Sequence, residues 1–369
     1  MNAVTLLAPA QTGNTQWLRP LRNWPQMAAQ LLRASGPLVR VLITHVRGST
    51  PRDAGSCMLV STQETQGTIG GGRLEWQAMA AARALLTDTT ATSARLQRLT
   101  LGAELGQCCG GVVELWLERL TSADLPLLDK LAQSLSQHES TVLLTELNAG
   151  HVTRRLVGRS IAGDSAPPPL RLLKGGRGHV TLSEHIEPAT PLWLYGAGHV
   201  GQALVRMLAE LPLSVHWLDD RNELMPAELP DGVSAGPVGQ PAGSIASAPA
   251  GTRFLVMTHD HALDYALCKA ALQRADMAWV GLIGSRSKAA RFRSRLRHDG
   301  IADDAIARLT CPVGITGIGS KWPAAIAVSV AAQILQTLPQ GSHLHEPPAE
   351  PGCTPEACAS CHQMHGVRP

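Results

Sequence analysis

The stretch Leu192-Trp-Leu-Tyr-Gly-Ala-Gly-His-Val-Gly201 decides the fold of the second half of this chain. An apolar run of strand length is followed at once by the pattern Gly-x-Gly-x-x-Gly, and a helix is predicted directly after it. In a dinucleotide-binding turn, Gly196 permits the tight bend, Gly198 lets a phosphate approach the backbone, and Gly201 lets helix and strand pack closely. The N–H groups at the helix start, beside His199, then face an anion. The stretch therefore predicts a Rossmann-like unit that begins near Leu192.

The residues beyond this turn continue the alternation of strands and helices. Further strands are predicted over 215–218, 254–257 and 279–283, and helices over 262–273, 288–298 and 323–335. Such alternation is typical of a parallel sheet that helices cover on both faces. Asp219 ends the second strand, about twenty residues beyond the first glycines, where it either accepts a hydrogen bond from a ribose hydroxyl or caps the following loop.

The first half of the chain has a different pattern. Strands are predicted over 38–46, 56–61, 95–101, 112–120, 141–147 and 151–157, and helices over 25–34 and 74–86. The fold class is therefore α/β, with an N-terminal mixed α/β domain and a C-terminal Rossmann-like, doubly wound parallel sheet. The predicted division is a flexible arm (1–22), the first domain (23–163), an irregular linker (164–191), the Rossmann-like domain (192–338) and a flexible tail (339–369).

Two glycine-rich loops of the first domain each end in an arginine. One runs from Gly48 to Arg52, and the other contains Gly70, Gly71 and Gly72 directly before Arg73. Each arginine offers a forked donor to a phosphate beside free backbone amides. A single arginine of this kind is more often solvated, but two such loops within a short stretch favour an anionic ligand.

Adjacent thiols lie in a third glycine-rich loop, where Cys108 and Cys109 are followed by Gly110 and Gly111. A thiolate that no side chain crowds can meet a soft metal or an electrophilic sulfur. The alternative is a turn with a buried thiol. Cys57, within a predicted strand, is expected in the core.

Further polar groups follow the strands of the second domain. His259, in a His-Asp-His run, can ligate a metal or hold a proton donor, or the run caps the next helix. Arg286 opens an arginine-rich helix that is expected to be mainly a solvated face, with Arg286 pointing at a ligand. Cys353, Cys358 and Cys361 in the tail either bind a metal with a histidine or belong to a disordered segment.

Composition excludes several classes of protein. A net charge of +3 in 369 residues indicates neither a nucleic-acid nor a membrane partner. No apolar run is long enough to cross a bilayer, and the N-terminus lacks the features of a signal peptide, so a cytoplasmic location is expected. Eight scattered cysteines form no disulfide framework.

Taken together, the motifs resemble the xanthine dehydrogenase accessory protein family (XdhC/CoxI). The resemblance covers about Leu38 to Leu335 and rests on several motifs in consistent order. These are Gly48 to Arg52, Gly67 to Glu75, Cys109 to Gly111, Gly196 to Gly201, Thr258 to His261, Gly281 to Arg286 and Cys311 to Gly314.

The resemblance implies a carrier that binds the molybdenum cofactor (molybdopterin), with residues 23–163 as its XdhC/CoxI-type cofactor-binding domain. Such a carrier shields the cofactor during sulfuration by a cysteine desulfurase and inserts it into apo xanthine dehydrogenase, and it is expected to be a homodimer and not an enzyme. By position, Cys109 is the candidate contact to molybdenum or its dithiolene. Arg52, Arg73 and their loops are candidates for the pterin phosphate.

Two other functions stay open on the sequence. An NAD(P)-dependent oxidoreductase is the first, because of the Gly196 turn and Asp219, although no group for hydride transfer is evident. A metal or redox sensor that works through the cysteines of the tail is the second.

Overall fold

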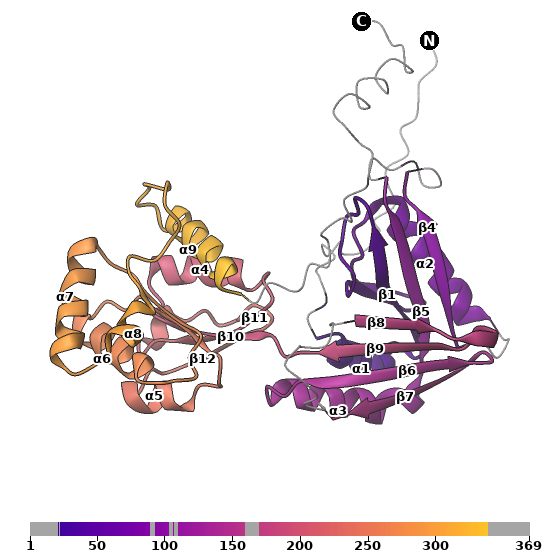
Figure 1. Cartoon of the computed structure of the whole chain (residues 1–369), viewed down its shortest axis with the longest axis horizontal. Helices are drawn as coiled ribbons and strands as arrows, with labels where there is room; N and C mark the ends of the chain where they lie inside the picture. Colours follow the sequence, from indigo (N-terminus) through magenta and orange to yellow (C-terminus); the bar gives the residue numbers. More distant parts are fainter. Residues whose placement is uncertain are drawn as a thin grey trace, which may run out of the picture.

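The computed structural model describes residues 21, 23–88, 93–102, 106, 110–158 and 170–338. Figure 1 shows an N-terminal region that ends with β9 and a C-terminal region that starts with β10. The predicted arm, except Leu21, and the predicted tail with its cysteines lie outside the described residues.

The N-terminal region contains two antiparallel sheets. In the first, called sheet A, the strand order is β3-β2-β1-β5-β4, and in the second, sheet B, it is β7-β6-β9-β8. The strands of sheet A are β1 (Leu38–Arg47), β2 (Cys57–Val60), β3 (Thr65–Gly67), β4 (Ala94–Thr100) and β5 (Val112–Leu120). The strands of sheet B are β6 (Thr141–Asn148), β7 (His151–Val157), β8 (Leu170–Lys174) and β9 (Val180–Ile186).

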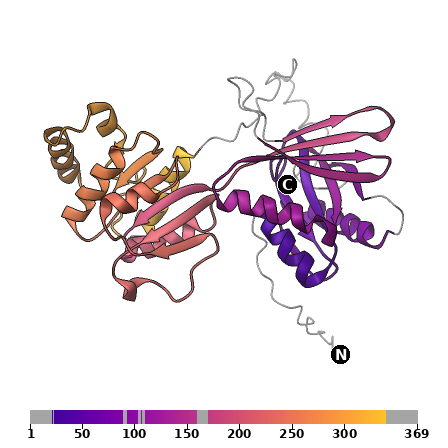
Figure 2. The ribbon, with the colours of Figure 1, turned by 90° about the horizontal axis from the view of Figure 1, so that it is seen from below.

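Helices cover both faces of sheet A. The helices of this region are α1 (Trp24–Ser35), α2 (Gly72–Thr87) and α3 (Leu125–Ser136), with short 3-10 turns η1 (Ser122–Asp124) and η2 (Gly176–Gly178). Alternation along β1 directs Val39, Val41 and Ile43 onto α2. The opposite face of sheet A packs on α1, α3 and sheet B through residues such as Trp116 and Leu143. Figure 2 shows α1 and α3 side by side below the sheets.

The prediction of an irregular linker over residues 164–191 was wrong for much of its length. Leu170–Lys174 and Val180–Ile186 are strands, and β9 pairs with both β6 and β8. Neighbouring glycines and prolines suggested irregular structure, but an antiparallel partner distant in sequence holds these residues extended. The strands therefore complete sheet B.

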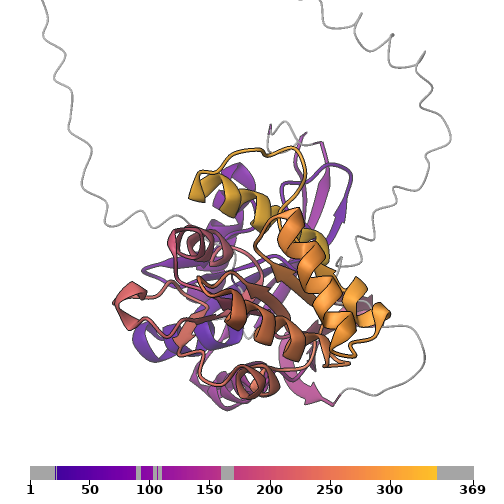
Figure 3. The ribbon, with the colours of Figure 1, turned by 90° about the vertical axis from the view of Figure 1, so that its left-hand side faces the viewer.

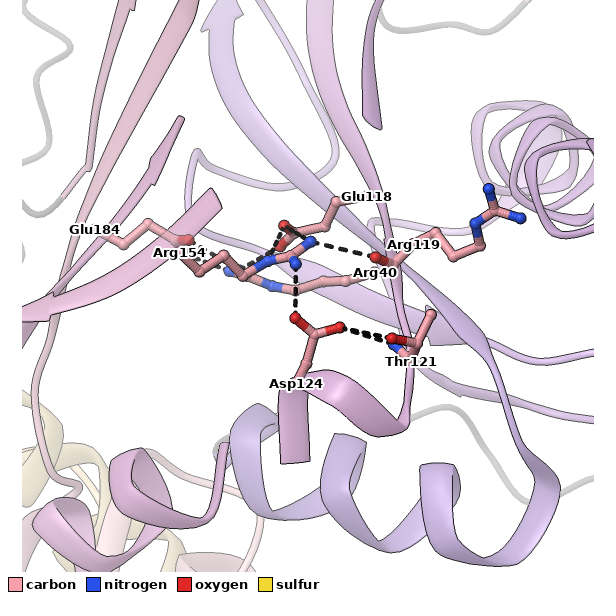
Figure 4. Close-up of polar contacts among 7 residues, drawn as sticks. All are labelled: Arg40, Glu118, Arg119, Thr121, Asp124, Arg154 and Glu184. Carbon is pink, nitrogen blue, oxygen red and sulfur yellow. Dashed lines mark hydrogen bonds and ion pairs between the residues drawn. The ribbon is translucent and has the colours of Figure 1, made fainter. Parts of the chain in front are cut away.

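A buried network of charges connects the two sheets (Figure 4). Glu118 of β5 accepts from Arg40 of β1 at 3.2 Å and from Arg154 of β7 at 2.8 Å. Arg40 also binds Glu184 of β9, and Arg154 binds Asp124 at 2.8 Å. Arg40 and Glu118 are 1% and 0% exposed, so these charges depend on one another for compensation.

The C-terminal region is a six-stranded parallel sheet in the order β12-β11-β10-β13-β14-β15. Counted along the chain this is the order 3-2-1-4-5-6 of the Rossmann fold, as predicted. The strands are β10 (Thr190–Tyr195), β11 (Leu213–Leu218), β12 (Val233–Gly236), β13 (Arg253–Val256), β14 (Trp279–Leu282) and β15 (Leu309–Thr310). The helices are α4 (His199–Leu208), η3 (Asn222–Leu224), α5 (Pro241–Ser247), α6 (His261–Leu272), α7 (Arg286–His298), α8 (Asp303–Ala307) and α9 (Pro323–Thr337).

Alternation in the strands gives this sheet two apolar faces. Leu192 and Leu194 of β10 face α4 and α9. Tyr195 and Phe254 face α5, α6 and α7. Figure 3 shows these helices gathered around the sheet. In the part of the chain that the structure describes, no helix is both long and apolar enough to cross a membrane.

Candidate functional site

Three loops of the N-terminal region meet at one end of sheet A. They are residues 48–52, residues 67–73 and, of the third loop, the described residues 102, 106, 110 and 111, and we call them the glycine-loop cluster. The Gly111 N–H donates to the Ser49 carbonyl at 3.0 Å. A Cβ on Gly70 would lie only 2.6 Å from Pro51, and one on Gly106 would lie 3.5 Å from the Arg73 guanidinium. The structure therefore brings together the two arginine loops and the described residues of the thiol loop.

The glycine-loop cluster and the start of α2 present exposed side chains. Arg52 and Arg73 are both exposed. Trp76, three residues beyond Arg73 on α2, is 66% exposed. Residues three apart share one face of a helix, so an indole ring and a guanidinium are presented together. Trp76 lies within the helix that the sequence predicts over residues 74–86, and nothing in the sequence marked it as a surface aromatic.

The expectation of free amides in the second loop needs correction. Glu75, which is 7% exposed, accepts from the N–H groups of Ile69 at 3.0 Å and Gly71 at 3.1 Å. The Gly70 N–H donates to the Thr68 hydroxyl at 3.1 Å. A carboxylate of the chain thus takes the place that we assigned to a bound anion. Arg52, Arg73 and Gly72 stay predictions as ligand contacts.

The two adjacent thiols cannot be placed in this site from the structure. Cys108 and Cys109 lie outside the described residues, so the proposed molybdenum contact of Cys109 stays a prediction. Gly111 is described, and a Cβ there would lie 2.3 Å from the Ser49 carbonyl oxygen. A glycine is therefore required where the third loop contacts the first. Cys57 is buried, as expected.

The Gly196 turn has the geometry that its sequence predicts. Gly196 has a φ of +120°, and its added Cβ would lie 2.4 Å from the Met257 carbonyl oxygen. An added Cβ on Gly201 would lie 2.1 Å from the Gly196 carbonyl oxygen. Gly198 has open space around the same position. The fold itself thus needs Gly196 and Gly201, whereas Gly198 leaves its backbone accessible.

Asp219 is engaged within the protein. Its carboxylate accepts from the Ala197 N–H at 2.6 Å and from two nitrogens of the Arg221 side chain at 2.9 and 2.7 Å. Burial alone would raise the pKa of Asp219, but the bonds from Arg221 and Ala197 lower it from 3.8 to about 2. These contacts match the loop-capping alternative, and the ribose contact stays a prediction.

Replacing Asp219 by Asn is expected to weaken the loss of stability in acid. Because the folded-state pKa is depressed, the ionised carboxylate stabilises the fold above about pH 4 and loses this contribution as the pH falls towards 2. Urea unfolding of both proteins between these values measures the effect. The stability difference between wild type and Asp219→Asn should shrink as the pH falls. The exposed Asp231 provides the control Asp231→Asn, and a difference for Asp219→Asn that stays constant with pH would contradict the assignment.

The other predicted residues of this region reach the same edge of the sheet. His199, His259 and Arg286 are exposed and follow β10, β13 and β14. The carboxyl ends of parallel strands share one edge, where ligands of such sheets bind. Asp260 caps α6 by accepting from the Ala262 N–H at 2.6 Å. The capping interpretation therefore holds for the middle residue of the His-Asp-His run.

Lys288 and Asp264 form a buried ion pair at this edge of the sheet, which the sequence did not predict. The Lys288 ammonium donates to Asp264 at 2.5 Å and to the Ile283 carbonyl at 3.0 Å. Asp264 in turn accepts from the Thr258 hydroxyl at 2.8 Å, so the pair joins the loops after β13 and β14. The helix from Arg286 was expected to be a mainly solvated face, but Lys288 is only 6% exposed. No local pattern in the sequence singles out Lys288, because its partner Asp264 lies 24 residues away.

The described residues contain no preformed metal site. Among the residues that the structure describes, no group of three or more His, Cys, Asp or Glu side chains could hold a metal ion. The tail cysteines Cys353, Cys358 and Cys361 lie outside those residues.

Comparisons with known proteins match both regions. Residues 192–334 match the family model described as the XdhC Rossmann domain, and residues 31–99 match the model of the XdhC and CoxI family. The first of these matches begins at the residue where the sequence predicts the Rossmann-like unit.

Two curated proteins are similar over most of the chain. The uncharacterized protein YqeB of Escherichia coli (strain K12) is 27% identical over 310 residues, which are 84% of this chain but 45% of that protein. The chain therefore spans less than half the length of this relative. A probable xanthine dehydrogenase subunit of Bacillus subtilis (strain 168) is 25% identical over 332 residues, which are 85% of this chain and 97% of that protein.

A solved structure supports the fold. The crystal structure of a xanthine dehydrogenase from Bacillus halodurans has a TM-score of 0.68 at 20% identity, and the match covers 86% of this chain and 97% of that one.

Proposed function

Because this chain belongs to the XdhC and CoxI family, we propose that it carries the molybdenum cofactor to a xanthine dehydrogenase or a related molybdenum hydroxylase. In this proposal it protects the cofactor during sulfuration and then inserts it into the apoenzyme. The observation that carries the proposal is the glycine-loop cluster, which gathers Arg52 and Arg73 beside the described end of the thiol loop.

The donors at this cluster fit the chemical groups of the cargo. Arginine binds a phosphate through a planar fork of N–H donors, so Arg52 and Arg73 suit the phosphate of molybdopterin. The exposed indole of Trp76 offers a flat apolar face to a pterin ring. A thiolate at Cys109 is a soft ligand, which suits molybdenum or exchange with its sulfur ligands. In this proposal, every contact to the cargo would come from a side chain and none from a backbone amide.

The partners follow from the same proposal. The name of the Bacillus subtilis relative refers to xanthine dehydrogenase, which makes an enzyme of that class the proposed recipient. A cysteine desulfurase is the proposed source of sulfur. We further propose that the protein acts in the cytoplasm as a homodimer and that its role is transfer and not catalysis.

The alternative of an NAD(P)-dependent oxidoreductase has weaker support. The strand order and the open backbone at Gly198 suit a nucleotide. The acidic residue that such a site would use is Asp219, whose carboxylate is already bound by Ala197 and Arg221. A phosphate bound at Gly198 requires no hydride chemistry, so the carrier remains the preferred function.

Replacing Cys109 by Ala tests the proposal. In a host that makes the cofactor, purified wild type should contain molybdenum and release a fluorescent pterin on oxidation. Cys109→Ala should reduce both by about threefold or more, because each soft metal contact contributes to binding. It should also slow activation of the apo-dehydrogenase.

The neighbouring thiol provides a matched control. Cys108→Ala removes an adjacent sulfur and is expected to leave the metal and pterin contents unchanged. Equal contents in wild type and Cys109→Ala, or no molybdenum and no pterin in the wild type, would refute the carrier function as proposed.

A further inference from the structure

Helix α9 carries apolar side chains on its outer side as well as on its inner side. None of its 15 residues is charged. Its inner side packs with α4 through Ala327, Val330 and Ile334 (Figure 1). On its outer side, Val328 and Leu335 are 48% and 41% exposed. A helix at a protein surface normally turns polar side chains outward, so the outer side of α9 is unusual for a surface helix.

The polar side chains of α9 point towards the protein instead. The Ser329 hydroxyl donates to the Ile315 carbonyl at 3.1 Å, and the side-chain oxygen of Gln333 accepts from the Gly314 N–H at 2.7 Å. The Thr337 hydroxyl accepts from an arginine of β13 at 2.9 Å. Residues four apart share one face of a helix, so these three side chains form one inward stripe. The outer side is left to apolar residues.

The outer side of α9 belongs to a concentration of exposed apolar side chains. Seven large apolar side chains are exposed in the part of the chain that the structure describes, and four of them lie within residues 318–335. These four are Ile318, Trp322, Val328 and Leu335. Exposed apolar side chains that gather in one place indicate a surface that another molecule covers.

The order of residues on the outer side indicates which molecule that is. Small and large side chains alternate there at the spacing of helices that pack side by side, and they are Ala325, Val328, Ala332 and Leu335. If two copies of α9 pair antiparallel about a two-fold axis at the level of Val330, Ala325 of one copy meets Leu335 of the other. Val328 meets Ala332 in the same way. Each large side chain thus faces a small one, whereas a parallel pair would set Val328 against Val328.

The charge of Lys321 favours the same orientation. Lys321 is exposed and lies directly before the first turn of α9. In the antiparallel pair it comes close to the C-terminal end of the other helix, where the last carbonyl groups carry a partial negative charge. In a parallel pair the two Lys321 ammonium groups would face each other.

We propose that a second copy of this chain covers the outer side of α9 in an antiparallel, two-fold symmetric pair. Such a pair uses the same patch on both copies, which the order of small and large residues provides. This inference rests on the homodimer of the proposed function and names its contact surface.

The length of α9 sets the strength of the contact. Its 15 residues make a helix about 22 Å long. One pair of such helices, with the exposed Trp322 at each end, buries an area near the lower limit of specific interfaces, which is roughly 1,000 Å² in total. A dimer that dissociates in the micromolar range is therefore expected.

Two charged variants test the contact on the full-length protein. Val328→Glu and Ala332→Lys each place an unpaired charge in the apolar contact, so each should weaken dimerisation by about tenfold or more in sedimentation equilibrium. An equimolar mixture of the two variants should restore a dimer, because the antiparallel register sets the introduced carboxylate beside the introduced ammonium group. The matched control is Ala290→Glu, at an exposed position of α7 on the opposite face of the sheet, which should dimerise as wild type does.

Three results would each overturn the proposal. The first is a wild type that stays monomeric at about 100 µM, well above the expected dissociation constant. The second is a Val328→Glu variant that dimerises as well as Ala290→Glu while circular dichroism shows both folded. The third is a mixture of Val328→Glu and Ala332→Lys that stays monomeric. The second result would leave a homodimer through another surface, and molybdenum and pterin contents enter none of the three, so the carrier function is tested separately.

Discussion

The variant Glu118→Gln should lower the free energy of unfolding by about 3–5 kcal/mol, because it removes one partner from a buried network of charges. Glu118 is fully buried and binds Arg40 and Arg154 with separate carboxylate oxygens. Burial would raise the pKa of Glu118, but the two arginines lower it, so the residue is a carboxylate in the folded protein. With a neutral amide in its place, Arg40 and Arg154 keep Glu184 and Asp124 as partners, but they lose the buried carboxylate that they share. The NH2 group of the amide would also face a guanidinium, donor against donor. Urea unfolding at neutral pH, followed by circular dichroism, measures the difference.

An exposed ion pair of the same region is the control. Arg33 and Asp129 lie 2.6 Å apart, with side chains 52% and 50% exposed. Arg33→Gln should cost at most about 1 kcal/mol, as for other surface pairs. If Glu118→Gln destabilises the protein no more than Arg33→Gln does, the network does not hold the two sheets together as we describe.

Gly201→Val is the second variant with a large expected effect, about 3 kcal/mol of destabilisation or more. A Cβ at this position would lie 2.1 Å from the Gly196 carbonyl oxygen, and that oxygen also accepts from the Trp217 indole at 3.0 Å. The helix cannot move away without opening its contact with β10. Thermal and urea unfolding should both show the loss.

Gly198→Ala is the control for Gly201→Val, because it adds a Cβ in the same turn at a position without close neighbours. An added Cβ at Gly198 meets nothing within 4 Å, so Gly198→Ala should change stability by less than about 1 kcal/mol. Comparable losses in Gly198→Ala and Gly201→Val would show that close packing at Gly201 is not the cause.

Local signals in the sequence were sufficient for much of the fold. The strands over residues 112–120 and 151–157 were predicted with the bounds that the structure shows, because apolar alternation and turn residues delimit them. The Rossmann-like sheet followed from the Gly196 turn and the strand and helix alternation after it. These features depend on residues close together in the chain.

Other elements depend on partners far away in the sequence. Helix α3 (Leu125–Ser136) was not predicted. Strand β9 was assigned to a linker, because Glu184 lies in the middle of that strand. A charged residue on the buried face of a strand breaks the apolar alternation, and only the presence of Arg40 explains it. The same reason hid the pair of Asp264 and Lys288 at the edge of the parallel sheet. Buried ion pairs become recognisable only when both partners are placed.

The candidate site was predicted in part. The sequence singles out the two glycine loops and their arginines, and the structure places the two loops next to each other, while their roles as ligand contacts stay predictions. The role of Glu75 was missed, since a glutamate three residues into a helix is also common at the surface. The contribution of Cys109 remains a prediction.

The carboxylate of Glu75 bears on how this loop can hold an anion. Glu75 accepts from the N–H groups of Ile69 and Gly71, so these two amides already have a counter-charge within the chain. In the proposed carrier, a phosphate at this loop would therefore be held by side chains and not enclosed by a ring of backbone N–H groups. A loop that carries its own counter-charge suits a ligand that is to be handed on, where an empty ring of amides would suit one that is to be retained.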